Sequence, residues 1–77
     1  MKNRIIEILS GIRPDIDFES ETELMDGGLL DSFDMVSIIS DLNDEFDISI
    51  RITELKAENF NSVDAMLALV QRLKGQA

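Results

Sequence analysis

Ser32, which directly follows Asp31, offers a hydroxyl group at the predicted start of a helix. A phosphate ester on that hydroxyl would lie near unpaired backbone N–H groups and the positive end of the helix dipole, a contact worth about 0.3–1 kcal/mol when exposed. Serine is also favoured at helix starts for structural reasons, so an ordinary capping-region serine is the alternative. The interpretation of Ser32 therefore depends on its surroundings.

The sequence contains no histidine and no cysteine. This absence excludes Ser-His and Cys-His catalytic arrangements, cysteine zinc sites, disulfides and reactions at a protein thiol. Carboxylates are abundant, but without a visible pocket they are better explained as surface charge than as catalytic groups. We therefore expect that the protein is not an enzyme.

With 16 acidic and 7 basic residues, the 77-residue chain has a formal net charge of −9. Such a charge repels nucleic acid phosphates and anionic lipid headgroups, so basic proteins are the expected partners. Acidity that serves only solubility is the alternative. No stretch approaches the ~20 apolar residues of a membrane span, and the N-terminal segment lacks the apolar run of a signal peptide. We expect a cytoplasmic monomer that binds no nucleic acid and does not insert into membranes.

A chain of this length is expected to form a single domain over residues 1–77 with one shared core. Apolar residues at helical spacing predict three longer helices. Their stripes are Ile5, Ile8, Leu9 and Ile12; Met35, Ile38, Ile39, Leu42 and Phe46; and Val63, Met66, Leu67, Val70 and Leu73. The first of these helices is expected to end at Gly11 to Pro14, where glycine and proline break it. The second is expected to run from Asp31 to about Phe46. The last is expected to begin at Asn61 or Ser62 and to end before Gly75.

Two connections complete the predicted architecture. The residues from Pro14 to Asp31 lack a sustained period and contain many turn-prone residues, which predicts a long loop. A loop this long is commonly functional and needs apolar anchors, here Ile16, Phe18, Leu24, Leu29 and Leu30. Between the last two long helices we expect an extended connector from Phe46 to Ile52 and a single helical turn from Thr53 to Lys56 or Ala57. The fold class is thus an all-α, small four-helix bundle, with three longer helices and one short helix.

Residues 28–36, Gly-Leu-Leu-Asp-Ser-Phe-Asp-Met-Val, resemble the acyl carrier protein family, in which an attachment serine follows an aspartate at the start of the second helix. The resemblance covers the whole chain and includes the helix order and the long first loop. The Leu-Leu-Asp-Ser run and the later segment of residues 55–60 are most similar to the D-alanyl carrier and peptidyl-carrier-like branch.

The resemblance implies that a phosphopantetheinyl transferase moves a 4′-phosphopantetheine arm from coenzyme A to Ser32, with Asp31 in the same attachment motif. It also implies that a loading ligase places an acyl or aminoacyl group on the arm as a thioester, for use by a downstream acyltransferase or synthase. A thiol that arrives on a cofactor would allow a chain without cysteine to take part in thiol chemistry.

Phe33 and Val36 lie off the predicted core stripe of the second helix, and both follow Ser32 within about one helical turn. Two apolar residues one turn apart and off the buried face predict a docking patch for partner enzymes, with loop packing as the alternative for both residues. Four carboxylates on the same helix are predicted to steer basic partners toward the serine, with an ordinary solvated face as the alternative, namely Asp34, Asp41, Asp44 and Glu45. Where fatty-acid carriers usually have glutamate and methionine, this chain has Ser37, Ser40 and Asn43, which favours aminoacyl or specialised acyl cargo.

A cofactor-free acidic helical adaptor, which would bind basic proteins through Phe33 and Val36, is the alternative function. Oxygen-bearing side chains also alternate from Asp41 to Asp47 in the manner of a calcium loop. Phe46 and Ile52, however, occupy the positions at which that loop requires glycine and glutamate, so we expect no metal site.

Overall fold

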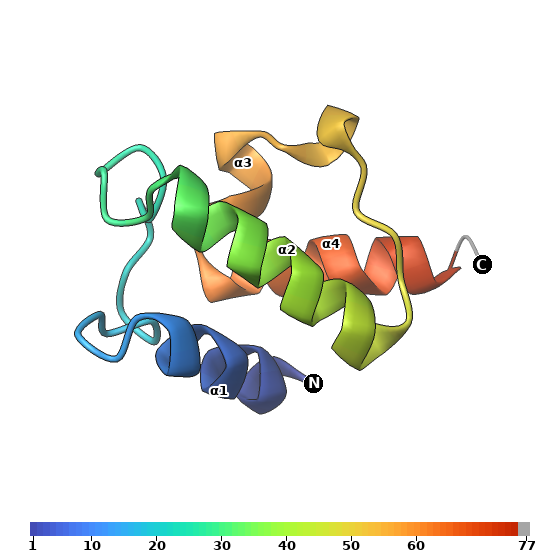
Figure 1. Cartoon of the computed structure of the whole chain (residues 1–77), viewed down its shortest axis with the longest axis horizontal. Helices are drawn as coiled ribbons and strands as arrows, with labels where there is room; N and C mark the ends of the chain where they lie inside the picture. Colours follow the sequence, from blue (N-terminus) through green and yellow to red (C-terminus); the bar gives the residue numbers. More distant parts are fainter. Residues whose placement is uncertain (76–77) are drawn as a thin grey trace.

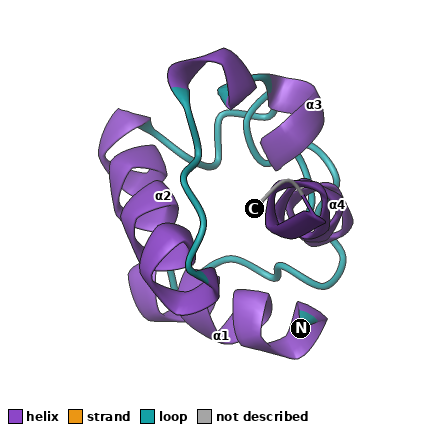
Figure 2. Cartoon of the chain, turned by 90° about the vertical axis from the view of Figure 1, so that its right-hand side faces the viewer, coloured by secondary structure: helices purple, strands orange, loops and turns teal. Residues whose placement is uncertain are grey.

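The computed structural model describes residues 1–75, which form helices and loops and contain no strand. The elements are α1 (Lys2–Ile12), α2 (Ser32–Phe46), the 3₁₀ turn η1 (Ile52–Glu54), α3 (Ala57–Phe60) and α4 (Val63–Gly75). Helix α1 packs against α2 and α4, and the short α3 packs against α4 (Figures 1 and 2). The predicted all-α bundle with a long loop between its first two helices is confirmed. Within residues 1–75 no helix has both the length and the apolar character needed to cross a membrane.

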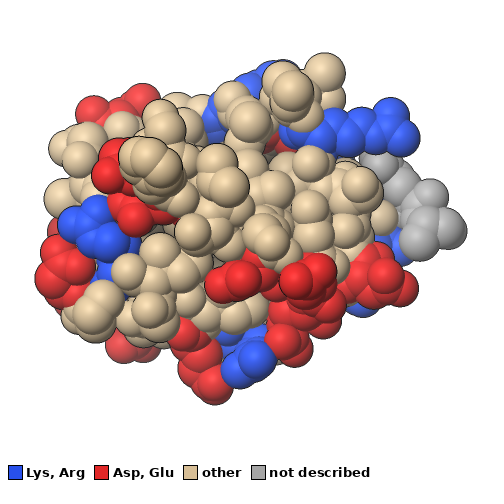
Figure 3. Space-filling model, viewed as in Figure 1, with Lys and Arg blue, Asp and Glu red and all other residues tan. Residues whose placement is uncertain are grey.

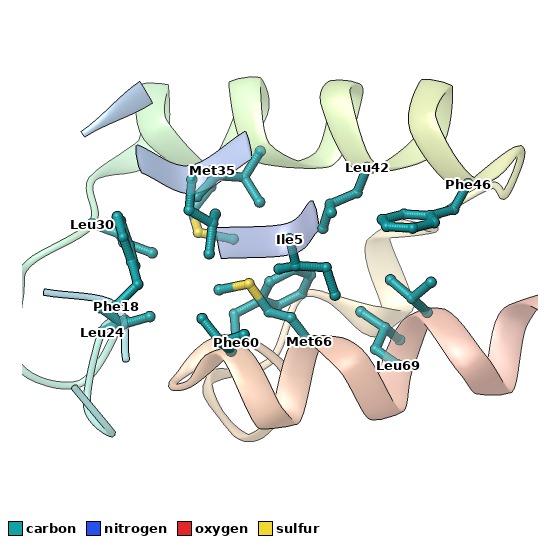
Figure 4. Close-up of a cluster of buried hydrophobic side chains, with 14 residues drawn as sticks. Ile5, Phe18, Leu24, Leu30, Met35, Leu42, Phe46, Phe60, Met66 and Leu69 are labelled. Carbon is teal, nitrogen blue, oxygen red and sulfur yellow. The ribbon is translucent and has the colours of Figure 1, made fainter. Parts of the chain in front are cut away.

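Apolar side chains from every α-helix and from the long loop meet in one core (Figure 4). Ile5 of α1, Leu42 of α2, Phe60 of α3 and Met66 of α4 are completely buried. Helix α3 has only four residues and could not persist alone, because helices shorter than about 12 residues are marginal in water. Burial of Phe60 therefore accounts for its presence.

The long loop is attached to this core at the predicted apolar positions. Phe18, Leu24 and Leu30 are buried, whereas Ile16 and Leu29 are partly buried against the same cluster. The loop is therefore anchored along its length, as the apolar residues within it predict.

Asn61, which follows α3, holds the loop by hydrogen bonds that the sequence pattern did not predict. Its Oδ1 accepts hydrogen bonds from the backbone N–H groups of Met25 and Asp26, each at 3.0 Å. Its Nδ2 donates to the Asp26 carboxylate at 2.9 Å, and its carbonyl accepts from the Leu24 N–H at 2.9 Å. Of the two predicted caps for α4, Ser62 is the residue used, since its Oγ accepts from the Ala65 N–H at 3.0 Å.

Two details of the predicted helices are wrong. The turn expected to begin at Thr53 is instead the 3₁₀ turn Ile52–Glu54, and the short α-helix is Ala57–Phe60. Burial of Phe60 outweighs the weak capping preference of Thr53. In α4, Leu69 is buried and Leu67 only partly so, because Leu69 falls on the same helical face as the buried residues one turn before it.

The connector after α2 has no regular structure, as predicted. Helix α2 ends at Phe46, and Asp47, its C-cap, adopts the left-handed conformation with φ 53° and ψ 52°. The Asn43 carbonyl accepts a hydrogen bond from the Ile48 N–H at 3.2 Å, and the Asn43 Oδ1 accepts one from the Ile50 N–H at 2.9 Å. These contacts supply partners for backbone groups that a lone strand would leave unpaired.

Candidate functional site

Ser32 is the first residue of α2 and is exposed to solvent. Asp31, the N-cap, has an extended backbone, and its Oδ1 accepts a hydrogen bond from the Asp34 N–H at 2.8 Å. The Asp34 Oδ2 in turn accepts one from the Asp31 N–H at 3.2 Å, which completes a capping box. The hydroxyl-bearing residue thus lies inside a hydrogen-bonded first turn, so its backbone is held while its side chain remains accessible.

The loop that leads into Ser32 closes tightly on itself. The Leu24 carbonyl accepts hydrogen bonds from the N–H groups of both Leu29 and Leu30, at 3.1 and 3.0 Å. Gly28 makes this turn possible, since its φ of +74° lies in the left-handed region that side chains disfavour. Because Leu24 and Leu30 are buried, the turn fixes the chain to the core just before the helix begins.

Asp34 is more deeply placed than the other acidic residues predicted for this site. Its side chain is 13% exposed, and its Oδ2 accepts a hydrogen bond from Arg13 Nη1 at 2.6 Å. Burial acts to raise the pKa of this carboxyl, but hydrogen bonds from the Asp31 backbone and from Arg13 outweigh that effect and lower the pKa below its usual 3.8. Asp34 is therefore ionised and paired inside the fold at neutral pH.

Asp34→Asn is expected to reduce stability at pH 7 by about 1–2 kcal/mol, since a hydrogen bond to a charged group is lost. The folded-state pKa of Asp34 lies below the unfolded-state value, so the ionised carboxylate stabilises the fold above about pH 4. This contribution disappears as the pH falls through the lower folded-state pKa. Urea unfolding at pH 7 and at successively lower pH should therefore show a smaller acid-induced loss for the variant than for the unaltered protein.

Asp44→Asn is the matched control, because Asp44 is an exposed carboxylate on the same helix. Its free energy of unfolding at pH 7 should stay within about 0.5 kcal/mol of that of the unaltered protein. Identical acid-induced losses in Asp34→Asn and the unaltered protein would show that the pair with Arg13 contributes nothing.

An apolar groove of about 500 Å³ opens beside Ser32. It is lined by Met25, Leu30, Asp31, Ser32, Met35, Val36, Ile39 and Leu55. Leu55 was missed by the sequence analysis, because its position opposite α2 depends on the path of the chain between η1 and α3. Ile39, predicted as a core residue, is only partly buried and contributes its side chain to the groove.

The predicted docking residues separate into an apolar and an acidic group. Phe33 is 86% exposed and Val36 is 69% exposed, so the loop-packing alternative does not hold for either residue. Three carboxylates, Asp41, Asp44 and Glu45, line a hollow of about 280 Å³ between α2 and α1. Figure 3 shows uncharged surface across α2, with acidic side chains along the edge that faces α1.

Arg4 also lines this acidic hollow. It donates to Glu45 at 2.8 Å, a hydrogen bond that lowers the pKa of that carboxyl. Asp34 does not belong to this group, because its carboxylate contacts Arg13. The docking role of Asp34 therefore stays a prediction, and its internal contacts compete with that role.

Comparisons with known proteins cover nearly the whole chain. A family model described as a phosphopantetheine attachment site matches residues 3–70. D-alanyl carrier proteins from Leuconostoc citreum and Leuconostoc mesenteroides subsp. mesenteroides are 30% and 32% identical over 76 residues, which is 97% of this chain and 97% of each relative. Aminoacyl carrier protein 1 of Bradyrhizobium diazoefficiens is 35% identical over 74 residues, covering 91% of this chain and 81% of the relative.

Proposed function

Since this chain belongs to the family of phosphopantetheine attachment domains, we propose that Ser32 is the residue to which its 4′-phosphopantetheine arm is joined. The chain is a carrier, which holds an acyl or aminoacyl group as a thioester on this covalently attached arm. The cofactor-free adaptor is not favoured. The observation that carries the proposal is the exposed position of Ser32 at the first residue of α2.

The residues around Ser32 fit a phosphate ester with a flexible arm. The free N–H groups of the first turn and the helix dipole favour a negative group at this position. Asp31 belongs to the same proposed site, because its carboxylate accepts from the Asp34 N–H and thereby holds the turn that carries Ser32. The adjoining groove, lined mainly by apolar side chains, is open to the less polar parts of an arm or cargo. When bound, the arm supplies the thiol that the chain lacks.

Carrier proteins of this family are typically non-catalytic and are served by partner enzymes such as ligases and transferases. We assign to this chain a phosphopantetheinyl transferase, a loading ligase and a downstream acyltransferase or synthase, and no catalytic step of its own. It would act in the cytoplasm as a single, monomeric domain. The names of the relatives, together with Ser37, Ser40 and Asn43, support aminoacyl cargo, for which D-alanyl is the first candidate.

The attachment residue can be identified directly. The unmodified protein is incubated with a phosphopantetheinyl transferase and coenzyme A, digested, and its peptides are weighed. One arm is expected, on the peptide that contains Ser32. An arm on another peptide, or none with several transferases, would contradict the proposal. The intact mass of protein isolated from its native host would also identify the cargo.

We propose Phe33 and Val36 as the apolar docking contacts, and Asp41, Asp44 and Glu45 as the carboxylates that steer basic partners. Phe33→Ala is expected to lower kcat/KM for arm attachment about tenfold, since interface anchors typically contribute more than ~1 kcal/mol. Ile52→Ala is the control, because Ile52 is similarly exposed (85%) but lies in η1 and not in the first turn of α2 beside Ser32. Equal effects of the two substitutions in a steady-state transferase assay would remove Phe33 from the docking surface.

A further inference from the structure

Arg13, which follows the last residue of α1, links that helix to the start of α2. Its Nη1 donates hydrogen bonds to Asp34 Oδ2 at 2.6 Å and to the Leu29 carbonyl at 3.0 Å. Its Nε and Nη2 donate to the two carboxylate oxygens of Asp15, each at 3.1 Å. One planar guanidinium group thereby contacts three separate parts of the chain, a geometry that a lysine ammonium on its flexible stem does not reproduce.

These contacts enclose Ser32 from both sides along the chain. Leu29 belongs to the tight turn that precedes Ser32, and Asp34 belongs to the capping box that follows it. The Asp34 oxygen that accepts from Arg13 also accepts from the Asp31 N–H. Arg13 is thus hydrogen-bonded directly to the segment before Ser32, at the Leu29 carbonyl. It is linked to Asp31, the N-cap of α2, through the Asp34 carboxylate.

The pair of Arg13 with Asp34 is also the more sheltered kind of ion pair. The two side chains are 31% and 13% exposed, compared with 46% and 21% for the pair of Arg72 with Glu54. Exposed ion pairs contribute little to structure, whereas shielded and charge-assisted hydrogen bonds are shorter and stronger. We therefore expect the Arg13 contacts to fix the positions of Leu29 and Asp34 as well as to neutralise the charge of the Asp34 carboxylate.

We propose that Arg13 is a positioning residue for the modification of Ser32: it holds the segments on either side of the serine so that the hydroxyl is presented in one geometry. This inference rests on the proposed function of Ser32 as the attachment site. Group transfer depends steeply on such geometry, and a misplacement of about 1 Å can lower a rate by ~100-fold. Arg13 acts through its neighbours and is not assigned any contact with the arm.

The test compares arm attachment to Arg13→Gln, Arg13→Lys and Lys2→Gln with that to the unaltered protein, using a phosphopantetheinyl transferase and coenzyme A. Lys2→Gln is the charge control: it removes one positive charge from α1 and an ion pair with Asp64 (2.8 Å), at the opposite end of that helix. Arg13→Gln is expected to lower kcat about tenfold while KM changes by less than about threefold. Lys2→Gln should stay within about twofold in both constants, and Arg13→Lys should fall in between.

Amide hydrogen exchange distinguishes local loosening around Ser32 from general destabilisation of the fold. In Arg13→Gln the N–H groups of Asp31 and Asp34 should exchange faster, while that of Leu42 in the middle of α2 should be unchanged. A kcat of Arg13→Gln equal to that of Lys2→Gln would overturn the inference; if Arg13→Gln fails to fold, an undiminished kcat of Arg13→Lys would do the same. An unaltered protein that accepts no arm at Ser32 would instead refute the proposed function, which separates the two failures.

Discussion

Ser32→Ala is expected to abolish attachment of the 4′-phosphopantetheine arm. The ester requires a side-chain oxygen, and alanine has none. The fold should be retained, since the capping box joins Asp31 to Asp34 and does not use the serine side chain. Alanine is also the best helix former, so any change in stability should stay within about 0.5 kcal/mol. Loss of modification would therefore report the chemistry of one hydroxyl and not a damaged helix.

Intact mass measurement after incubation with transferase and coenzyme A checks this expectation. Ser37→Ala is the matched control, because Ser37 is also an exposed serine of α2. It should gain one arm, as the unaltered protein does. An arm on Ser32→Ala would contradict the proposal outright. The adaptor alternative makes the opposite functional prediction, namely that Ser32→Ala binds and serves its partners normally.

The helices around this site could be predicted from the sequence because their signals are local. Asp31 was predicted as the residue at which α2 begins, and its side chain caps the first turn of that helix. The apolar stripe of α2 likewise identified Met35, Ile38 and Leu42 as buried. Such patterns depend only on helical periodicity, which is independent of the rest of the fold.

The contacts that hold the site together could not be predicted in the same way. Arg13 and Asp34 are 21 positions apart, and Asn61 is separated from Met25 by 36 positions. A polar residue in a loop gives no sequence signal of which distant carboxylate or backbone group it will meet. Leu55 was missed for the same reason, since only the tertiary path of residues 47–56 brings it to the groove beside Ser32.

Helix α2 is held at both ends by basic side chains from other parts of the chain. Arg13 contacts its first turn, and Lys74 Nζ of α4 donates to the Phe46 carbonyl at its last residue, at 3.1 Å. A cation near carbonyl groups at a helix C-terminus is favourable, whereas Arg13 acts at the N-terminus only through the carboxylate of Asp34. This arrangement explains how an acidic chain can fix the helix that carries its proposed attachment serine while leaving the exposed side chains of that helix free for the proposed partners.

Phe60→Ala is expected to have the largest effect on stability, a loss of about 3–5 kcal/mol. The ring is completely buried in the shared core, and α3, which has only four residues, depends on the burial of that ring. A chain of this size has a total stability of roughly 4–12 kcal/mol, taking ~0.05–0.15 kcal/mol per residue. The substitution would therefore remove a large part of the stability, and urea unfolding followed by circular dichroism should show a much lower midpoint.

Phe33→Ala is the matched control for this experiment, because Phe33 is the same residue type at 86% exposure. Its midpoint should stay close to that of the unaltered protein, within about 0.5 kcal/mol. A similar midpoint for the two variants would mean that α3 is not part of the cooperative core. The destabilisation caused by Phe60→Ala should also affect the proposed attachment site, since the next residue, Asn61, holds Met25 and Asp26 in the loop that leads to Ser32. Faster amide exchange at Met25 in Phe60→Ala, under conditions where the variant is still folded, would demonstrate that connection.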